Sequence, residues 1–304
     1  MPSSVFNAPN SAVSSPSDDE HWPISRLLTW TKDYFGKRGI ASPLLEAELL
    51  LGHVLGYERY QLYMHYAEDV GSVAREQFRN LIKRRAAGEP VAYLIGKKDF
   101  YMLSLRVSPA VLIPRPETEL VVDEFLDSAK GLSEPKVADI GTGSGCIALA
   151  CAKGHPTAKV WATDVSEDAL AVARANAQTA KLDDRVEFRG GSLLEPIQDI
   201  APFDFILSNP PYIPSPTIAT LERDVRDFEP KLALDGGLDG LDILRQLTRQ
   251  AADALRSGGV LVMEIGFDQE DAVRGLLSDE AVWEVGPVIR DAAKHPRVIR
   301  AVRK

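Results

Sequence analysis

The sequence has little that would favour a disulfide framework or a metal site. It contains only two cysteines, Cys146 and Cys151, and five histidines in 304 residues. The intervening segment IALA favours a single helix, and five helical positions give about 7.5 Å of axial rise, which exceeds the usual span of a disulfide. The histidines lack ligand-like spacing, so we expect no metal. Unbridged cysteines are typical of a reducing compartment, and we expect a cytoplasmic protein.

Long hydrophobic runs and an excess of positive charge are also absent. No apolar segment approaches the roughly 20 residues of a membrane-spanning helix, so we expect no membrane partner. The formal net charge is −9, whereas nucleic-acid binding needs clustered Lys and Arg, so we expect no direct nucleic-acid contact. Residues 1–22 contain no Lys or Arg, are rich in Ser and Pro, and lack the apolar region of a signal peptide. We predict a disordered tail there.

Residues 23–90 have the texture of a small helical domain. One apolar stripe at helical spacing consists of Ile24, Leu27, Leu28, Thr31 and Tyr34 or Phe35. A second helix is predicted in SPLLEAELLLGHVLG, with Ser42 as N-cap and Gly56 as its C-terminal stop, and a third over 72–87. Residues 91–113 change to short aromatic and β-branched runs, VAYLIG and DFYMLSLRVS, which predict a β-hairpin linker.

Residues 114–304 alternate between strand-like and helix-like segments. The predicted strands are VADIG, KVWATDV, VEFRGGS, FDFILSN and GVLVMEIG. Helices are predicted around 147–152, 166–180 and 241–255. Such alternation indicates βαβ units and a parallel sheet, so the fold class is α/β. Two last runs, VWEVGPVIRD and RVIRAVRK, resemble a closing antiparallel pair.

Two of the predicted strands end in residues that suit a nucleoside. The glycine turn DIGTGSG, 139–145, follows the first strand, and Asp164 ends the second. Glycines let the backbone approach a ligand closely, and a carboxylate accepts hydrogen bonds from ribose hydroxyls. The spacing is GxGxG rather than GxGxxG, and no basic residue stands ready for a pyrophosphate. The alternative is a tight turn that binds nothing.

A third strand ends in Asn-Pro-Pro-Tyr, 209–212, where the prolines must stop the hydrogen-bonded ladder. Asn209 offers a side-chain carbonyl, Pro210 a backbone carbonyl and Tyr212 an aromatic face. Two acceptors can hold both hydrogens of one NH2 group and expose its nitrogen lone pair to an electrophile. The alternative is an ordinary Asn-Pro turn.

The motifs IPRPETE, DIGTGSG, NPPY, EPKLALDGGLDGL and LVMEIGFDQ occur in this order. Together they resemble the protein-(glutamine-N5) methyltransferases that modify peptide-chain release factors, over about residues 24–304. The resemblance implies a seven-stranded, Rossmann-like class I methyltransferase sheet over 114–304 behind a helical N-terminal domain. Because residues 23–90 have no catalytic signature, we expect this helical domain to recognise the substrate. It also implies S-adenosylmethionine as cofactor, S-adenosylhomocysteine as product, and the glutamine of the Gly-Gly-Gln loop of class 1 release factors as methyl acceptor.

The same resemblance implies roles for individual residues. The methionine end of the cofactor would contact Gly141, Thr142, Gly143, Ser144 and Gly145, and Asp164 would bind the ribose. Asn209 would touch both cofactor and substrate, with Pro210, Pro211 and Tyr212 completing the glutamine pocket; Asn209, Pro210 and Tyr212 are the expected catalytic residues. The family commonly has Asp and an aromatic residue near the adenine, where this chain has Ser192 and Leu193. Apolar packing by Leu193 is therefore expected there.

Several alternatives remain open at this point. Cys146, at a predicted helix start, is either an activated thiolate or a small packing residue. Arg115, Glu117 and Glu119 either organise the site entrance or form a surface salt-bridge set. A nucleic-acid amino methyltransferase acting on adenine N6 or guanine N2 would need the same clamp, although the acidic charge disfavours it. The last alternative is a non-catalytic binding module that kept the fold. The intact glycine, acid and NPPY motifs disfavour it, and a lack of cofactor binding would favour it.

Overall fold

The structure is a computed structural model that describes residues 21–304. The predicted tail of 1–22 lies, apart from its last two residues, outside the described residues. The chain divides into two compact units between Ala87 and Gly88, close to the predicted domain boundary at residue 90. Each unit is described by itself below. No helix within 21–304 is both long and apolar enough to cross a bilayer.

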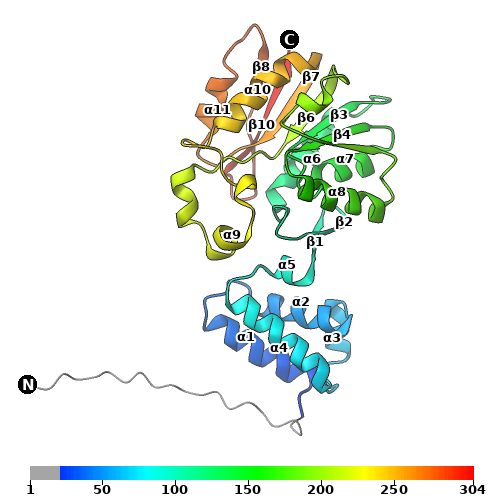
Figure 1. The fold of residues 1–304 in the computed structure, drawn as a ribbon, viewed down its shortest axis with the longest axis vertical. Helices are drawn as coiled ribbons and strands as arrows, with labels where there is room; N and C mark the ends of the chain where they lie inside the picture. The colour runs from blue at the N-terminus through cyan, green and yellow to red at the C-terminus, as the bar shows by residue number, and fades with distance from the viewer. Residues whose placement is uncertain (1–20) are drawn as a thin grey trace, which may run out of the picture. The chain divides into compact units, whose positions relative to one another are not determined.

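Residues 21–87 of the first unit form four helices, three of them where the sequence predicted helices and a short one, α3 (Arg59–Met64), that it did not predict (Figure 1). They are α1 (Ile24–Gly36), α2 (Pro43–Leu55), α3 (Arg59–Met64) and α4 (Ser72–Ala86). The stripe of α1 is buried, with Phe35 rather than Tyr34 as its last core residue. Gly56 ends α2 with a φ of 68°, a left-handed conformation that glycine adopts freely. Ser42 occupies the predicted N-cap position directly before Pro43, although its side chain makes no capping hydrogen bond.

The second unit begins with a short helix where a strand was expected. Val91–Ile95, in VAYLIG, form α5, so the strand prediction for this run is wrong. A short apolar run fits a buried helical turn as well as a strand, and Pro90 before it suits a helix start. The predicted hairpin is present downstream as β1 (Lys97–Phe100) and β2 (Leu103–Arg106), paired antiparallel. Its Phe100 and Leu105 pack into the core of the second unit.

A large sheet organises the rest of the second unit. Its strands are β3 (Lys136–Ile140), β4 (Lys159–Asp164), β5 (Val186–Gly190), β6 (Phe203–Ser208), β7 (Leu255–Glu264), β8 (Trp283–Val285), β9 (Ile289–Arg290) and β10 (Pro296–Arg303). Seven strands follow one another in the order β5-β4-β3-β6-β7-β10-β8, and the two-residue β9 pairs beside β8 on β10. The strands from β5 to β7 are parallel, and β10 is antiparallel to β7, β8 and β9. The predicted seven-stranded α/β sheet with its closing antiparallel strands is thus confirmed.

Helices cover both faces of this sheet because its strands are apolar on both sides. The covering helices are α6 (Glu119–Ser128), α7 (Cys146–Gly154), α8 (Glu167–Ala180), α10 (Asp242–Ala254) and α11 (Glu270–Leu276). The short α9 (Arg223–Phe228) buries no residue and does not belong to these layers. Residues alternate along β7: Val260 and Val262 pack in the core with α6 and α7, while Leu261 and Met263 pack in the core with α10 and α11. Figure 1 shows α7 and α8 on the opposite side of the sheet from α10 and α11.

The strand order reverses between β3 and β6, because the chain runs from β3 outwards to β5 and then returns to β6 on the other side. In open parallel sheets, ligands bind outside the carboxyl ends of the strands at such a reversal. Short 3₁₀ turns lie near these ends: η1 (Pro116–Thr118), η2 (Glu195–Ile197), η3 (Ser215–Thr220) and η4 (Lys231–Ala233). The reversal therefore fixes where the predicted site residues meet.

Candidate active site

The glycine turn connects β3 to α7 and is fastened to the end of β4. The backbone N–H groups of Gly141 and Thr142 both donate to the Thr163 carbonyl at 2.9 Å. Gly141 and Gly143 have φ values of 71° and 55°, and a Cβ added at either would meet no described atom within 4 Å. The turn therefore presents backbone without side chains to open space. The N–H groups of Gly141 and Thr142 are already bonded to Thr163, so they are not available to bind a phosphate.

Asp164, at the end of β4, holds the same turn through its carboxylate. One carboxylate oxygen accepts from the Gly143 N–H and the other from the Ser166 N–H, each at 2.9 Å. Burial raises the pKa of Asp164, and these backbone donors oppose the rise. Each oxygen has a second lone pair, so the carboxylate can still accept from a ligand hydroxyl.

A cavity of about 220 Å³ joins these strand ends. Of the residues predicted for the site, its lining includes Gly141, Thr142, Gly143, Ser144, Asp164, Leu193, Asn209, Pro210 and Pro211. Apolar side chains make up much of the remaining wall, among them Val111, Ile140 and Ile243. The structure thus brings together residues from four strand ends around one hollow.

Two predicted residues, Gly145 and Tyr212, stand outside this lining within the described chain. Gly145 has a φ of 83°, and a Cβ there would approach Leu149 and Ala173 to 3.2 and 3.3 Å. Its part in the structure is the close packing of the turn against α7 and α8. The Tyr212 phenol donates to the buried Glu264 carboxylate at 3.0 Å, so its hydroxyl is directed at the end of β7.

The side-chain amide of Asn209 is held by a residue that the sequence did not single out. Its Nδ2 donates to the Thr118 hydroxyl at 2.9 Å, and that hydroxyl donates to Glu264 at 2.6 Å. Thr118 and Glu264 are both buried. Burial raises the pKa of Glu264, and the Thr118 and Tyr212 hydroxyls oppose the rise. Thr118 therefore engages the NH2 group of Asn209 and not its side-chain carbonyl oxygen.

The backbone of the NPPY segment is fixed by the other motifs. Gln269 donates through Nε2 to the Tyr212 carbonyl at 2.9 Å and accepts from the Gly266 N–H at 2.9 Å. Ile213 pairs with Asp235 as an isolated parallel bridge. The motifs LVMEIGFDQ and EPKLALDGGLDGL therefore form a frame around NPPY.

Arg115 joins the IPRPETE motif to the buried Glu229 at 2.6 Å. The second oxygen of Glu229 accepts from the Ile113 N–H at 3.3 Å. Burial raises the pKa of Glu229, and Arg115 opposes the rise. Glu119 accepts from the Tyr101 N–H at 3.0 Å. Of the two roles left open for Arg115, the structure favours organisation of the site, because its partner is buried rather than on the surface.

Leu193 follows β5 and lines the cavity with Ser192. Its φ of 49° is unusual for a branched side chain, and the Thr163 hydroxyl donates to its carbonyl at 2.7 Å. This hydrogen bond ties the Leu193 loop to β4. The Leu193 side chain contributes apolar surface to this wall of the cavity.

A buried carboxyl group, Asp139, and a partly buried thiol, Cys146, lie at the glycine turn. Asp139 accepts from the Thr142 hydroxyl at 2.6 Å and from the Ala148 N–H at 3.1 Å, and burial raises its pKa to about 7. Burial likewise raises the pKa of Cys146 to about 12, so its thiol stays protonated at neutral pH. The packing role of Cys146 is therefore favoured over an activated thiolate.

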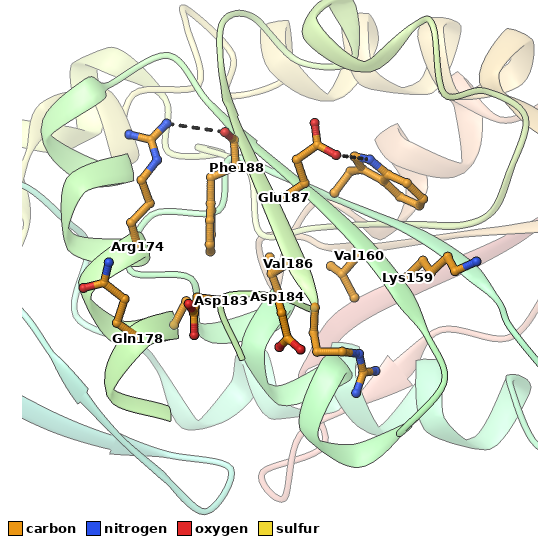
Figure 2. Close-up of a pocket in the computed structure, with 12 residues that line it drawn as sticks. Lys159, Val160, Arg174, Gln178, Asp183, Asp184, Val186, Glu187 and Phe188 are labelled. Atoms are coloured by element: carbon orange, nitrogen blue, oxygen red, sulfur yellow. Dashed lines mark hydrogen bonds between the residues drawn. The ribbon is translucent and has the colours of Figure 1, made fainter. Parts of the chain in front are cut away.

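A larger hollow, of about 530 Å³, lies at β4 and β5 beside α8 (Figure 2). Figure 2 shows Arg174 directed at the carbonyl of Phe188, where it donates at 3.4 Å. None of the residues predicted for the site lines this hollow. It lies away from the carboxyl ends of β3 and β6, so its size does not make it the active site. Within 21–304, no group of three or more His, Cys, Asp or Glu is arranged to hold a metal.

The residues missed by the sequence reasoning are Thr118, Glu264, Gln269 and Glu229. All four lie within quoted motifs, but long-range contacts give each of them a partner: Thr118 and Glu264, for example, are 146 positions apart. The sequence did contain one signal for these residues: they are polar residues within otherwise apolar or proline-rich motifs. A polar group in a buried motif needs a hydrogen-bonding partner.

Two family models match this chain. The model described as "PrmC N-terminal domain" matches residues 26–96, and the "Methyltransferase small domain" model matches residues 116–222. The first match covers the helices of the first unit together with α5. The second begins at η1 and contains the glycine turn, Asp164 and NPPY.

Solved structures show the same fold at low sequence identity. The catalytic domain of hMettl16, solved with the MAT2A 3′UTR hairpin 6, has a TM-score of 0.54 at 18% identity, covering 73% of this chain and 81% of that one. A methyltransferase from Pyrococcus furiosus has a TM-score of 0.50 at 20% identity, covering 73% and 98%. Both similarities concern the fold alone.

Curated relatives are similar over nearly the whole chain. The release factor glutamine methyltransferase of Rhodopirellula baltica is 41% identical over 287 residues, 93% of this chain and 97% of that protein. The proteins of the same name from Geobacter sulfurreducens and Moorella thermoacetica are 42% and 43% identical, covering 85% and 88% of this chain and 89% and 93% of theirs. With this identity and coverage, and with the glycine turn, Asp164 and NPPY around one cavity, the chain belongs to the release factor glutamine methyltransferase family.

Proposed function

We propose that this protein transfers a methyl group from S-adenosylmethionine to the side-chain amide nitrogen, N5, of the glutamine in the Gly-Gly-Gln loop of class 1 peptide chain release factors. The observation that carries the proposal is the position of Asn209. Its Nδ2 is engaged by Thr118, which leaves the side-chain carbonyl for the cavity that it lines with Pro210. A pair of carbonyls at a strand end suits the two hydrogens of a primary amide.

The residues around the cavity fit the cofactor. Gly141 and Gly143 provide bare backbone beside open space, which suits the methionine part. Asp164 supplies acceptors for ribose hydroxyls, and Leu193 and Val111 supply apolar surface for the base. The N–H groups of Gly141 and Thr142 are used within the protein, as expected for a ligand without a pyrophosphate.

The cofactor, when bound, supplies a methyl group on a sulfonium. Asn209 and Pro210 hold the glutamine NH2 by both hydrogens, so that its lone pair is directed at the methyl carbon. A nitrogen–carbon bond would form as the carbon–sulfur bond breaks, S-adenosylhomocysteine would leave, and the proton lost from the nitrogen would pass to water. The buried Glu264 and the protonated Cys146 make no covalent bond in this scheme.

Incubation with labelled S-adenosylmethionine and a purified class 1 release factor, followed by mass mapping, tests the function. We expect label on the Gly-Gly-Gln glutamine alone. Parallel reactions with DNA and RNA test the amino methyltransferase alternative. Label in nucleic acid and none in the factor would contradict the proposal.

Asp164→Ala should weaken cofactor binding. The variant loses a charged acceptor for the ribose and also frees the Gly143 N–H, at a cost of roughly 1.5 to 3 kcal/mol. Calorimetry should therefore show a Kd that rises roughly 10- to 150-fold. Asp168→Ala is the matched control, because Asp168 is an exposed acid in the first turn of α8. An unchanged Kd for Asp164→Ala contradicts the assignment.

We further propose that the helical residues 23–90 recognise the body of the release factor, while residues 114–304 carry out methyl transfer. The support is an exposed apolar surface at α3, where Tyr60 and Met64 are 65% and 73% exposed. Isolated exposed residues are ordinary, but exposed aromatic side chains that cluster favour a binding surface. Tyr63 and Tyr66 stack beside them at 5.6 Å between ring centroids.

The double variant Tyr60→Ser/Met64→Ser should raise KM for the intact release factor at least about fivefold, because the loss of more than about 1 kcal/mol of contact energy weakens binding by that factor. Methylation of a short Gly-Gly-Gln peptide should be unchanged, since the active site is intact. Val73→Ser, at a 74% exposed apolar position on α4, is the control. Equal losses on peptide and intact factor would refute this role.

A further inference from the structure

A hydrogen-bonded chain of four side chains runs from the end of β7 to the cavity. Tyr212 and Thr118 donate to opposite oxygens of Glu264, at 3.0 and 2.6 Å. Thr118 in turn accepts from Asn209 Nδ2 at 2.9 Å. Glu264 is only 2% exposed and Thr118 1%, so water does not compete for these bonds.

The direction of each bond follows from the chemistry of Glu264. Both hydroxyls donate to Glu264 in the structure, the arrangement that an ionised carboxylate requires because it can only accept. The Thr118 hydroxyl has a single hydrogen, which it uses in its hydrogen bond to Glu264. Towards Asn209, the Thr118 oxygen can therefore act only as an acceptor. Asn209 must then turn its NH2 towards Thr118, and its carbonyl takes the opposite direction. Burial and the neighbouring Glu264 raise the pKa of Tyr212, so the phenol stays a donor.

We propose that Glu264 and Thr118 are positioning residues that fix the rotation of the Asn209 amide, so that its carbonyl rather than its NH2 meets the methyl acceptor. If the Asn209 amide were rotated by 180°, its own NH2 group would face the NH2 group of the substrate. The two sets of hydrogens would repel each other, and no hydrogen bond would form. The identity of the acceptor rests on the proposed function, but the orientation of Asn209 does not.

The network also links β7 to η1 and β6, so a purely structural role must be separated from a positioning role. A structural role would lower stability and leave the two rate effects additive. A positioning role acts only through Asn209, so its effect must disappear once the Asn209 amide is removed. A double-mutant cycle distinguishes these cases.

The first experiment measures kcat on the release factor at saturating cofactor for Thr118→Val, Asn209→Ala and the double variant. Valine matches threonine in shape but lacks the hydroxyl, and we expect kcat to fall roughly 10- to 100-fold with a much smaller change in KM. In the Asn209→Ala background, Thr118→Val should change kcat less than about twofold. Thr118→Ser should recover most of the loss because it restores the hydroxyl.

A control and a second network variant accompany these. Thr248→Val removes another buried hydroxyl, which donates to the Leu244 carbonyl at 2.9 Å within α10, and should leave kcat unchanged. Glu264→Gln offers one acceptor for two hydroxyl donors, so it should lower kcat as Thr118→Val does. Wild-type kcat in Thr118→Val, or equal additional losses in the Asn209→Ala background, would overturn the proposal.

The second experiment needs no substrate. In protein labelled with ¹⁵N-asparagine, the Asn209 carboxamide signals, assigned by their loss in Asn209→Ala, should exchange slowly with water in the wild type. Thr118→Val should speed this exchange at least about tenfold, since the NH2 loses its acceptor. Unchanged exchange refutes the orientation even if methylation is observed, whereas absent methylation with slow exchange refutes only the proposed function.

Discussion

Asn209→Ala should lower kcat roughly 100- to 1,000-fold, the loss typical of removing one preorganised hydrogen-bonding group from an active site. The Pro210 carbonyl alone cannot hold both hydrogens of the glutamine NH2, so the nitrogen loses its alignment with the methyl group. The measurement is steady-state methylation of a release factor at saturating cofactor. Cofactor affinity, measured separately by calorimetry, should fall much less.

Asn209→Asp is the size-matched companion to this variant. An aspartate oxygen would replace the Nδ2 that now donates to Thr118 at 2.9 Å. Glu264 and the new carboxylate would then compete for the single Thr118 proton, and two buried acids would repel each other. We therefore expect turnover nearly as low as in Asn209→Ala. Near-wild-type turnover in the alanine variant would show that NPPY is not the amide clamp.

Arg115→Ala should lower the free energy of unfolding by about 3 kcal/mol, because it leaves a buried carboxylate without its cation. The side chain of Glu229 is 1% exposed and that of Arg115 is 33% exposed, so most of the cost comes from Glu229. For a unit of this size the melting temperature should fall by roughly 6 to 12 °C. Thermal unfolding of the full chain without ligand is the measurement.

The pH dependence of this loss has a definite sign. Burial already raises the pKa of Glu229, and removing Arg115 should raise it further. The difference in free energy of unfolding between wild type and Arg115→Ala is therefore largest at pH values above the raised pKa of Glu229. It shrinks as the pH falls and Glu229 becomes protonated. Retention of the full difference at acid pH would contradict this account.

Two variants check that the effect belongs to the buried pair. Arg223→Ala removes an exposed arginine that pairs with Asp227 at 3.4 Å on α9, and should cost less than about 0.5 kcal/mol. Arg115→Leu/Glu229→Leu replaces both charges with apolar groups and should recover most of the stability. An unchanged melting temperature in Arg115→Ala would mean that Glu229 is compensated elsewhere.

Local patterns succeeded where the signal lies within a few residues. The five parallel strands occur where the strand-like runs predicted them, and the signal is clearest for β3 and β6, which are buried along almost their whole length and are largely apolar. Asp164 ends β4 and Asn209 directly follows β6, so predicting the strands also predicted that these residues share one edge of the sheet. VAYLIG failed because a run of this length fits either a helical turn or a strand.

The sequence by itself determined the α/β class, the two-part organisation, the motifs and the family resemblance, since these depend on composition, periodicity and spacing along the chain. Only the tertiary structure decided which polar groups meet. Asn209 and Thr118 are 91 positions apart, and Thr118 and Glu264 are 146 apart, so no local pattern pairs them. Hydrogen bonds in a buried site depend on side-chain direction and on the exclusion of water, and these arise only when β6, β7 and η1 pack together.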